Sequence, residues 1–104
     1  MDIRHVWHGH SLIVVVSGDL SGHGCGEEFM QNVLDAEAGR SEELVFDLAK
    51  SFIPGSRFIA KFVELSSLLR ARRVRVHLRT SGNHSATEAF RLFSIDKIVD
   101  VFED

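Results

Sequence analysis

Two short apolar runs, each followed by a helical pattern, constrain the fold of this chain more than any other feature. Residues 12–16 are continuous, apolar and mostly β-branched, which is typical of a strand that is covered on both faces. Residues 44–48, apolar except for Asp47, predict another strand of this buried type. After each run, apolar residues recur at helical spacing, over residues 29–38 and 58–69. Strands that alternate with helices favour a largely parallel sheet joined by right-handed crossovers.

The segments outside these two units add strands and a helix. Residues 3–7 predict a first strand, and a turn at residues 8–11 joins it to the second in an antiparallel hairpin. The alternation of Val74, Val76 and Leu78 with polar residues predicts a strand with one face exposed to solvent, or an edge strand.

The C-terminal part predicts a short helix over residues 86–93, whereas residues 95–102 fit either a last strand or a helical turn. We therefore predict a single α/β domain over residues 1–104. Its sheet is mixed, mostly parallel and four- to five-stranded, and helices that begin near Gly26, Ser56 and Ser85 pack it.

Charge and cysteine content narrow the functional class. The net charge of −3 argues against nucleic acid as the main partner. Cys25 is the only cysteine, so no internal disulfide can form, which fits a reducing compartment. The N-terminus lacks an apolar signal segment, and the longest apolar run is too short to cross a bilayer. We therefore expect a cytoplasmic protein without membrane insertion.

The junction after the central strand, residues 50–57, is the segment that joins structure to function most directly. A Pro-Gly turn, Pro54-Gly55, leads to Ser56 at the start of a helix, where backbone N–H groups lack partners. A phosphate on Ser56 would place negative charge at the positive end of that helix, beside Arg57. The alternative, which the residues alone favour, is that Ser56 only caps the helix.

The glycine loop at residues 18–26 is a weaker candidate. It follows a strand and precedes a helix, as a dinucleotide fingerprint does, but Glu27 stands where the third glycine belongs. His8, His10, His23 and Cys25 could converge on a metal if the hairpin turn and this loop were neighbours, although no spacing matches a zinc signature.

Catalysis has little support in the sequence. Cys25 near His23 could be an activated thiol, yet no third group is evident to orient the pair. Asp47 at a strand end is interpreted as a cap of the next turn. We therefore predict neither a cofactor nor a metal, and no enzyme.

Five segments in order are similar to those of the STAS domain, the module of bacterial anti-sigma factor antagonists. Residues 16–21 resemble the second strand and Gly-Glu-Leu-Asp turn of that family, and residues 44–48 its central Leu-Val-Leu-Asp-Leu strand. Residues 52–58 fall on the Phe-Ile-Asp-Ser-Ser-Gly-Leu signature, with Pro54, Gly55 and Arg57 where the family has Asp, Ser and Gly. Residues 69–76 and 90–98 resemble the next helix end and the C-terminal segment.

The resemblance implies a regulatory domain that binds another protein. In the family, an anti-sigma factor with serine kinase activity phosphorylates the second serine of the signature, and Ser56 occupies that position. The implied partner surface is Ser21, Gly22, His23, Pro54, Gly55, Ser56, Arg57, Phe58 and Lys61. Two alternatives remain: a constitutive adaptor subunit of an ABC lipid transporter or a stress-signalling assembly, and nucleotide or small-molecule binding through the glycine loop.

Overall fold

The computed structural model describes residues 1–52, 55–92 and 100–102. It confirms the predicted order of strands and helices, and the helices begin within one residue of the predicted positions. Of residues 95–102, the described part is a strand, and residues 93–99 lie outside the described ranges. The elements are β1 (Asp2–His8), β2 (Ser11–Asp19), α1 (Cys25–Glu37), β3 (Glu43–Phe52), α2 (Ser56–Ala71), β4 (Arg75–Arg79), α3 (His84–Leu92) and β5 (Asp100–Phe102).

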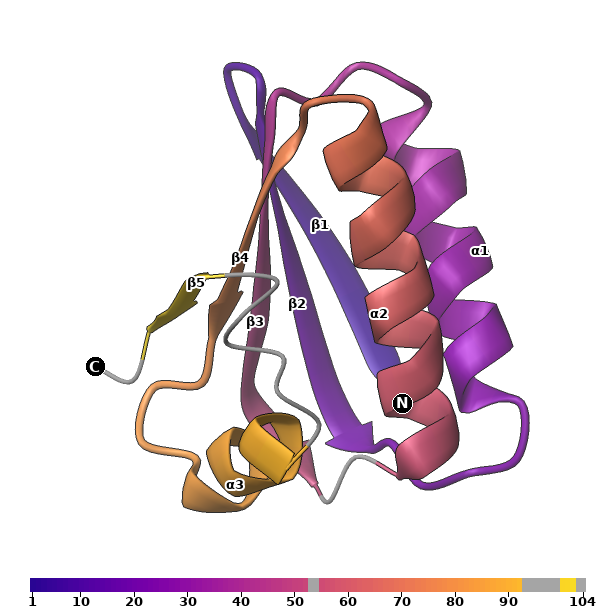
Figure 1. The fold of residues 1–104 in the computed structure, drawn as a ribbon, viewed down its shortest axis with the longest axis vertical. Coiled ribbons are helices and arrows are strands. Elements are labelled where there is room, and N and C mark those ends of the chain that lie inside the picture. The colour runs from indigo at the N-terminus through magenta and orange to yellow at the C-terminus, as the bar shows by residue number, and fades with distance from the viewer. Residues whose placement is uncertain (53–54, 93–99, 103–104) are drawn as a thin grey trace.

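The strands form one five-stranded sheet in the order β1-β2-β3-β4-β5. The sheet is mixed and mostly parallel, which confirms the predicted fold class. β1 is antiparallel to β2, and every other neighbouring pair is parallel. Each crossover moves to the next strand in the same direction. Because such crossovers are right-handed, their helices fall on one face of the sheet. Figure 1 shows α1 and α2 side by side on that face.

The expectation that β2 and β3 are covered on both faces is wrong. Leu12, Val14 and Val16 are fully buried under the helices, whereas Ile13 and Val15 between them are partly exposed. β3 shows the same alternation from Leu44 to Leu48. The second face is open because the strands follow one another in sequence order, so that the described helices all lie on the first face.

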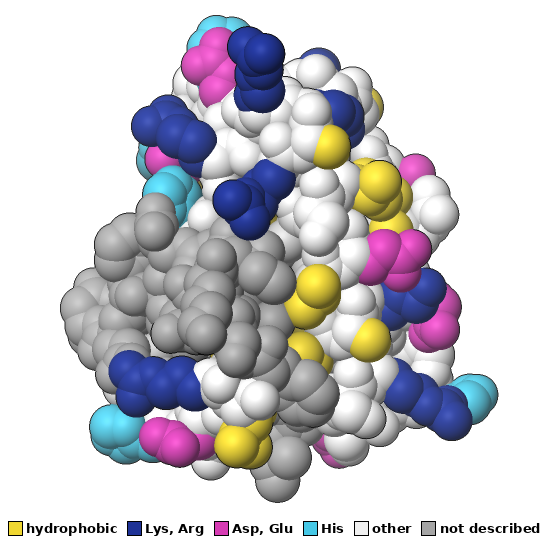
Figure 2. Space-filling view, in the orientation of Figure 1, with side chains coloured by type: hydrophobic (Ala, Val, Ile, Leu, Met, Phe, Trp, Pro, Cys, Tyr) yellow, Lys and Arg dark blue, Asp and Glu magenta, His cyan; other side chains and the backbone are white. Residues whose placement is uncertain are grey.

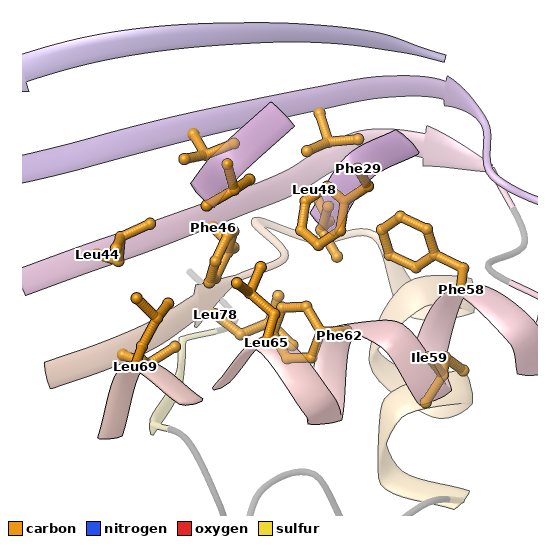
Figure 3. Packing of buried hydrophobic residues seen from close by; sticks show 14 of the residues in the cluster. Phe29, Leu44, Phe46, Leu48, Phe58, Ile59, Phe62, Leu65, Leu69 and Leu78 are labelled. Carbon is orange, nitrogen blue, oxygen red and sulfur yellow. The ribbon is translucent and has the colours of Figure 1, made fainter. Parts of the chain in front are cut away.

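An aromatic cluster fills the space between the sheet and the helices (Figure 3). Phe62 of α2 lies at its centre, with its ring centroid 5.1 Å from those of Phe46 and Phe90. Phe29 of α1 contacts Phe58 of α2 at 4.8 Å. Tilted and edge-on ring pairs of this kind add to the stabilisation from apolar burial. The contact with Phe90 also places α3 on the same face as α2.

A buried carboxylate joins the far ends of α1 and α2. Glu37 accepts hydrogen bonds from the Gly39 N–H (3.0 Å), from the N–H and hydroxyl of Ser41 (3.3 and 2.8 Å) and from the Arg72 guanidinium. Burial opposes its ionisation, but these donors outweigh burial, so the pKa of Glu37 lies below its ordinary value of 4.5. The pair fixes the carboxyl ends of both helices.

β3 is longer than predicted and contains a bulge. Asp47 does not end the strand. It lies inside β3, and its Oδ1 accepts a hydrogen bond from the Ala49 N–H at 3.0 Å. The register with β2 then shifts between Val15 and Ser17. One extra residue in a strand exchanges the faces of all later residues. As a result Ser51 is buried and Phe52 points outward with 63% of its surface exposed.

A candidate docking surface at the amino end of α2

Two loops meet where β2 and β3 end. Because these strands are parallel neighbours, their carboxyl ends lie at one edge of the sheet. The Leu20 N–H donates to the Phe52 carbonyl at 3.3 Å, and a Cβ on Gly55 would lie 3.6 Å from the Ser21 Cα. The sequence-predicted loop and junction are therefore in contact. We call residues 21–23, 52 and 55–57 together with Lys61 the docking surface.

Ser56 is the first residue of α2 and is exposed. The interpretation of Ser56 as a helix cap is wrong: Gly55 holds the cap position, and no side chain caps the helix. Its first turn contains no acidic residue either. The exposed Ser56 side chain therefore lies at a helix end whose dipole favours an anion.

Arg57 is held by the other loop. Its Nη1 lies 2.5 Å from Nδ1 of His23, and Figure 2 shows a cationic side chain against a histidine at this end of α2. A guanidinium can only donate hydrogen bonds, so Nδ1 of His23 is the acceptor in this contact. This contact joins the loop to the helix across the docking surface.

The loop has its own internal support. Both the N–H and the hydroxyl of Ser21 donate to Oδ1 of Asp19, at 2.8 and 2.5 Å. These bonds hold the pKa of Asp19 below its ordinary value of 3.8. Gly24 then turns the chain into α1 with a φ of 83°, a left-handed conformation that suits glycine. The exposed residues Ser21 to His23 are thus carried on a defined turn.

The structure brings together most of the residues predicted to bind a partner. Ser21, Gly22, His23, Ser56 and Arg57 are exposed, and Gly55 and Lys61 are partly exposed. Phe58 is a correction: only 1% of it is exposed, because at this helical position it packs against Phe29 in the core. Pro54 lies outside the described residues.

Phe52 is a candidate contact that sequence reasoning missed. Its ring is exposed next to the junction and lines a groove of about 420 Å³ between the end of β3 and the turn before α3. Asn83 closes this groove, because its Nδ2 donates to the carbonyls of Leu48 (3.0 Å) and Ser51 (2.8 Å). An exposed aromatic side chain beside a groove is the kind of residue that anchors protein interfaces.

The metal arrangement considered from the sequence does not occur. The hairpin of His8 and His10 and the loop of His23 and Cys25 lie at opposite ends of β2. Among residues 1–52, 55–92 and 100–102, no three His, Cys, Asp or Glu side chains are grouped to hold an ion. The Cys25 thiol lies 4.0 Å from the Asp19 carbonyl oxygen. No helix in the described ranges has the length and apolar character needed to cross a membrane.

Solved structures share this fold. An anti-sigma factor antagonist from Mycobacterium paratuberculosis matches with a TM-score of 0.85 and 17% identity, over 99% of this chain and 86% of its own. The protein TM1081 matches with a TM-score of 0.80 and 16% identity, over 95% and 78% of the two chains.

The anti-sigma factor antagonist SpoIIAA in its unphosphorylated form matches with a TM-score of 0.66 and 14% identity, over 93% of this chain and 97% of its own. These structures confirm the predicted resemblance at the level of the fold. Comparison of the sequence with protein-family models and with curated proteins finds no match.

Proposed function

We propose that this chain is a non-enzymatic regulatory domain that binds another protein through the docking surface. The observation that carries the proposal is the exposed Ser56 at the uncapped start of α2, flanked by Arg57 and by the His23 loop. Two structures with this fold are anti-sigma factor antagonists. They favour a partner of the anti-sigma factor class. They also favour a role for this chain in the regulation of transcription, in the bacterial cytoplasm.

Phosphorylation of Ser56 is proposed as the switch. A phosphate there would accept hydrogen bonds from the free N–H groups of the first turn of α2 and from Arg57. It would compete with His23 for the Arg57 guanidinium, whose Nη1 now lies 2.5 Å from Nδ1 of His23. It would also add close to two negative charges to the surface. A partner that fits the unmodified surface would then meet both altered charge and an altered loop.

Exposed Phe52 supports a further contact that does not depend on phosphate. Its ring and the adjacent groove offer apolar area next to the charged residues of α2. We expect Phe52→Ala to weaken partner binding while leaving the melting temperature nearly unchanged, because an exposed ring contributes little to the core.

The test is capture from the cytosol of the source cells with wild type, Ser56→Ala and Ser56→Asp as baits, followed by intact-mass measurement of each bait. We expect wild type and Ser56→Ala to retain the same partner, and we expect Ser56→Asp to retain at least tenfold less of that partner than the wild type does. We also expect the mass increment of one phosphate on part of the wild type and none on Ser56→Ala. Equal retention by all three baits with no phosphate on the wild type would contradict the switch and favour a constitutive adaptor.

A further inference from the structure

A pocket lies at the end of β2 opposite the docking surface. The turn between β1 and β2 and the segment after α1 form it, and Figure 1 shows both at the same end of the molecule. The pocket has a volume of about 600 Å³ and is lined by Trp7, Gly9, His10 and Arg40. Ligand pockets in proteins commonly measure about 300–1,000 Å³. The volume therefore suits a small molecule, and the lining residues indicate its chemical class.

The pocket exists because α1 ends before it covers all of β1. Trp7 pairs in register with Leu12, which is fully buried under the helices, so the indole is on the same face of the sheet. α1 ends at Glu37, and the chain turns away at Ala38 and Gly39 with φ angles of 46° and 74°. The indole is left 37% exposed as a result.

A backbone hydrogen bond joins the two walls of the pocket. Gly9 and His10 form the two-residue turn between β1 and β2. The Glu42 N–H, from the segment after α1, donates to the His10 carbonyl at 2.8 Å. The bond holds the turn against that segment, so the pocket is formed before any ligand arrives.

Arg40 supplies a cation beside the indole. Its guanidinium carbon lies 5.2 Å from the centroid of the Trp7 ring, which is a cation–π contact. Its Nη2 is 3.4 Å from the Ala36 carbonyl oxygen, a long hydrogen bond. A guanidinium has five N–H donors. Most of those of Arg40 therefore remain available to a ligand that also touches the indole.

No acidic group offsets this cation within the pocket. Among the described residues, no carboxylate lies within ion-pair distance of Arg40. The acidic residues closest to it along the chain are Glu37, Glu42 and Glu43, and none of them lines the pocket. Glu37 and Glu43 accept hydrogen bonds from other side chains. Glu42 contributes its backbone N–H to the walls.

We propose that this pocket binds a planar aromatic ring that carries an anionic group. The ring packs on the exposed part of Trp7, as aromatic pairs do. The anion accepts charge-assisted hydrogen bonds from Arg40, which already lies beside the indole, and His10 offers a further ring nitrogen. Nucleotides and aromatic carboxylates both have this chemistry. The inference goes beyond the proposed function, because the pocket and the docking surface lie at opposite ends of β2.

The test uses Trp7 as its own reporter, because it is the only tryptophan in the chain. Its fluorescence is titrated with adenosine 5′-monophosphate and with benzoate, and then with adenosine and inorganic phosphate, which each lack one half of the ligand. We expect saturable quenching by at least one of the first two, which identifies the class. We expect the matching half-ligands to bind at least tenfold more weakly. No saturation by either probe up to about 10 mM, tenfold above a Kd of about 1 mM, would overturn the proposal. So would phosphate binding as tightly as the nucleotide.

Variants locate the binding by titration calorimetry. Arg40→Gln should weaken binding of the probe at least tenfold, because the cation is lost. Arg70→Gln is the matched control, since it removes an exposed arginine at the carboxyl end of α2 that does not line the pocket, and it should bind as the wild type does.

Trp7→Leu should weaken binding of the same probe, whereas Trp7→Phe keeps an aromatic face and should bind more tightly than Trp7→Leu. Circular dichroism confirms that each variant is folded before it is scored. Equal affinity of wild type and Arg40→Gln, or of the two Trp7 variants, would overturn the proposal. Neither result bears on partner capture by the docking surface.

Discussion

Gly26 shows how one residue sets the distance between two helices. A Cβ at this position would lie 2.8 Å from the Lys61 Cγ and 3.0 Å from the Arg57 carbonyl oxygen. Only glycine allows α1 to approach α2 this closely, and the approach brings His23 within reach of Arg57. The glycine was visible in the sequence as part of a loop, but its role depends on a residue 35 positions away (61 − 26).

We therefore expect Gly26→Ala to lower the free energy of unfolding by about 1–3 kcal/mol, the range for overpacking a close contact. Gly55→Ala is the matched control, because its Cβ would meet the Ser21 Cα at an ordinary 3.6 Å with a φ of −72°. Urea unfolding of both variants measures the difference. Equal losses for the two would show that α1 and α2 are not in close contact at Gly26.

Glu37 gives a second prediction at the level of the residue. Glu37→Gln keeps the shape of the side chain but removes the charge that Arg72, Gly39 and Ser41 satisfy. We expect a loss of about 2–4 kcal/mol, as for breaking a buried ion pair whose second member is partly exposed. Glu28→Gln, at an exposed position of the same helix, should change stability by less than about 0.5 kcal/mol.

The same carboxylate makes stability depend on pH with a defined sign. The pKa of Glu37 is lower in the folded chain than its ordinary value of 4.5, so the unfolded chain binds more protons in this range. Its contribution is therefore complete above about pH 4.5 and is lost as the pH falls through the folded pKa. Unfolding free energies measured from pH 7 to pH 3 should fall more steeply for the wild type than for Glu37→Gln. Parallel curves would contradict this assignment.

At the scale of the element, α2 has a core face and a solvent face. Phe62 is fully buried among Phe29, Phe46 and Phe90, whereas Leu68 on the same helix is 48% exposed. Phe62→Ala should lower the free energy of unfolding by about 3–5 kcal/mol through lost burial and the cavity left behind. Leu68→Ala should lower it by about 1 kcal/mol or less. Thermal unfolding of the two variants compares them directly, and similar losses would place the core elsewhere.

β3 explains why part of the site could not be predicted from the sequence. Phe46 and Leu48 point inward, so strict alternation also points Phe52 inward. The bulge after Asp47 reverses this and exposes the ring. A bulge is a property of how two strands pair, and the β3 sequence alone does not reveal it. The start of α2 was predicted correctly because Pro54-Gly55 and the helical spacing are local signals.

For the whole molecule, element order was predictable and coverage of the sheet was not. The apolar runs at residues 12–16 and 44–48 identified two strands of the sheet, and their alternation with helices identified the sheet as mostly parallel. Coverage of one face or both depends on strand order, which no local pattern encodes. The same limit applies to the site. The loop and the junction were each predicted, but their contact follows from β2 lying beside β3.

The central claim is that partners bind at the docking surface, and one matched comparison tests it most directly. Retention of the captured partner is measured for wild type, Arg57→Glu and Arg70→Glu, which reverse one exposed arginine at the amino end and one at the carboxyl end of the same helix. We predict that Arg57→Glu retains at least tenfold less partner than the wild type, whereas Arg70→Glu retains as much partner as the wild type. Equal retention by both folded variants, or loss only with Arg70→Glu, would contradict the claim.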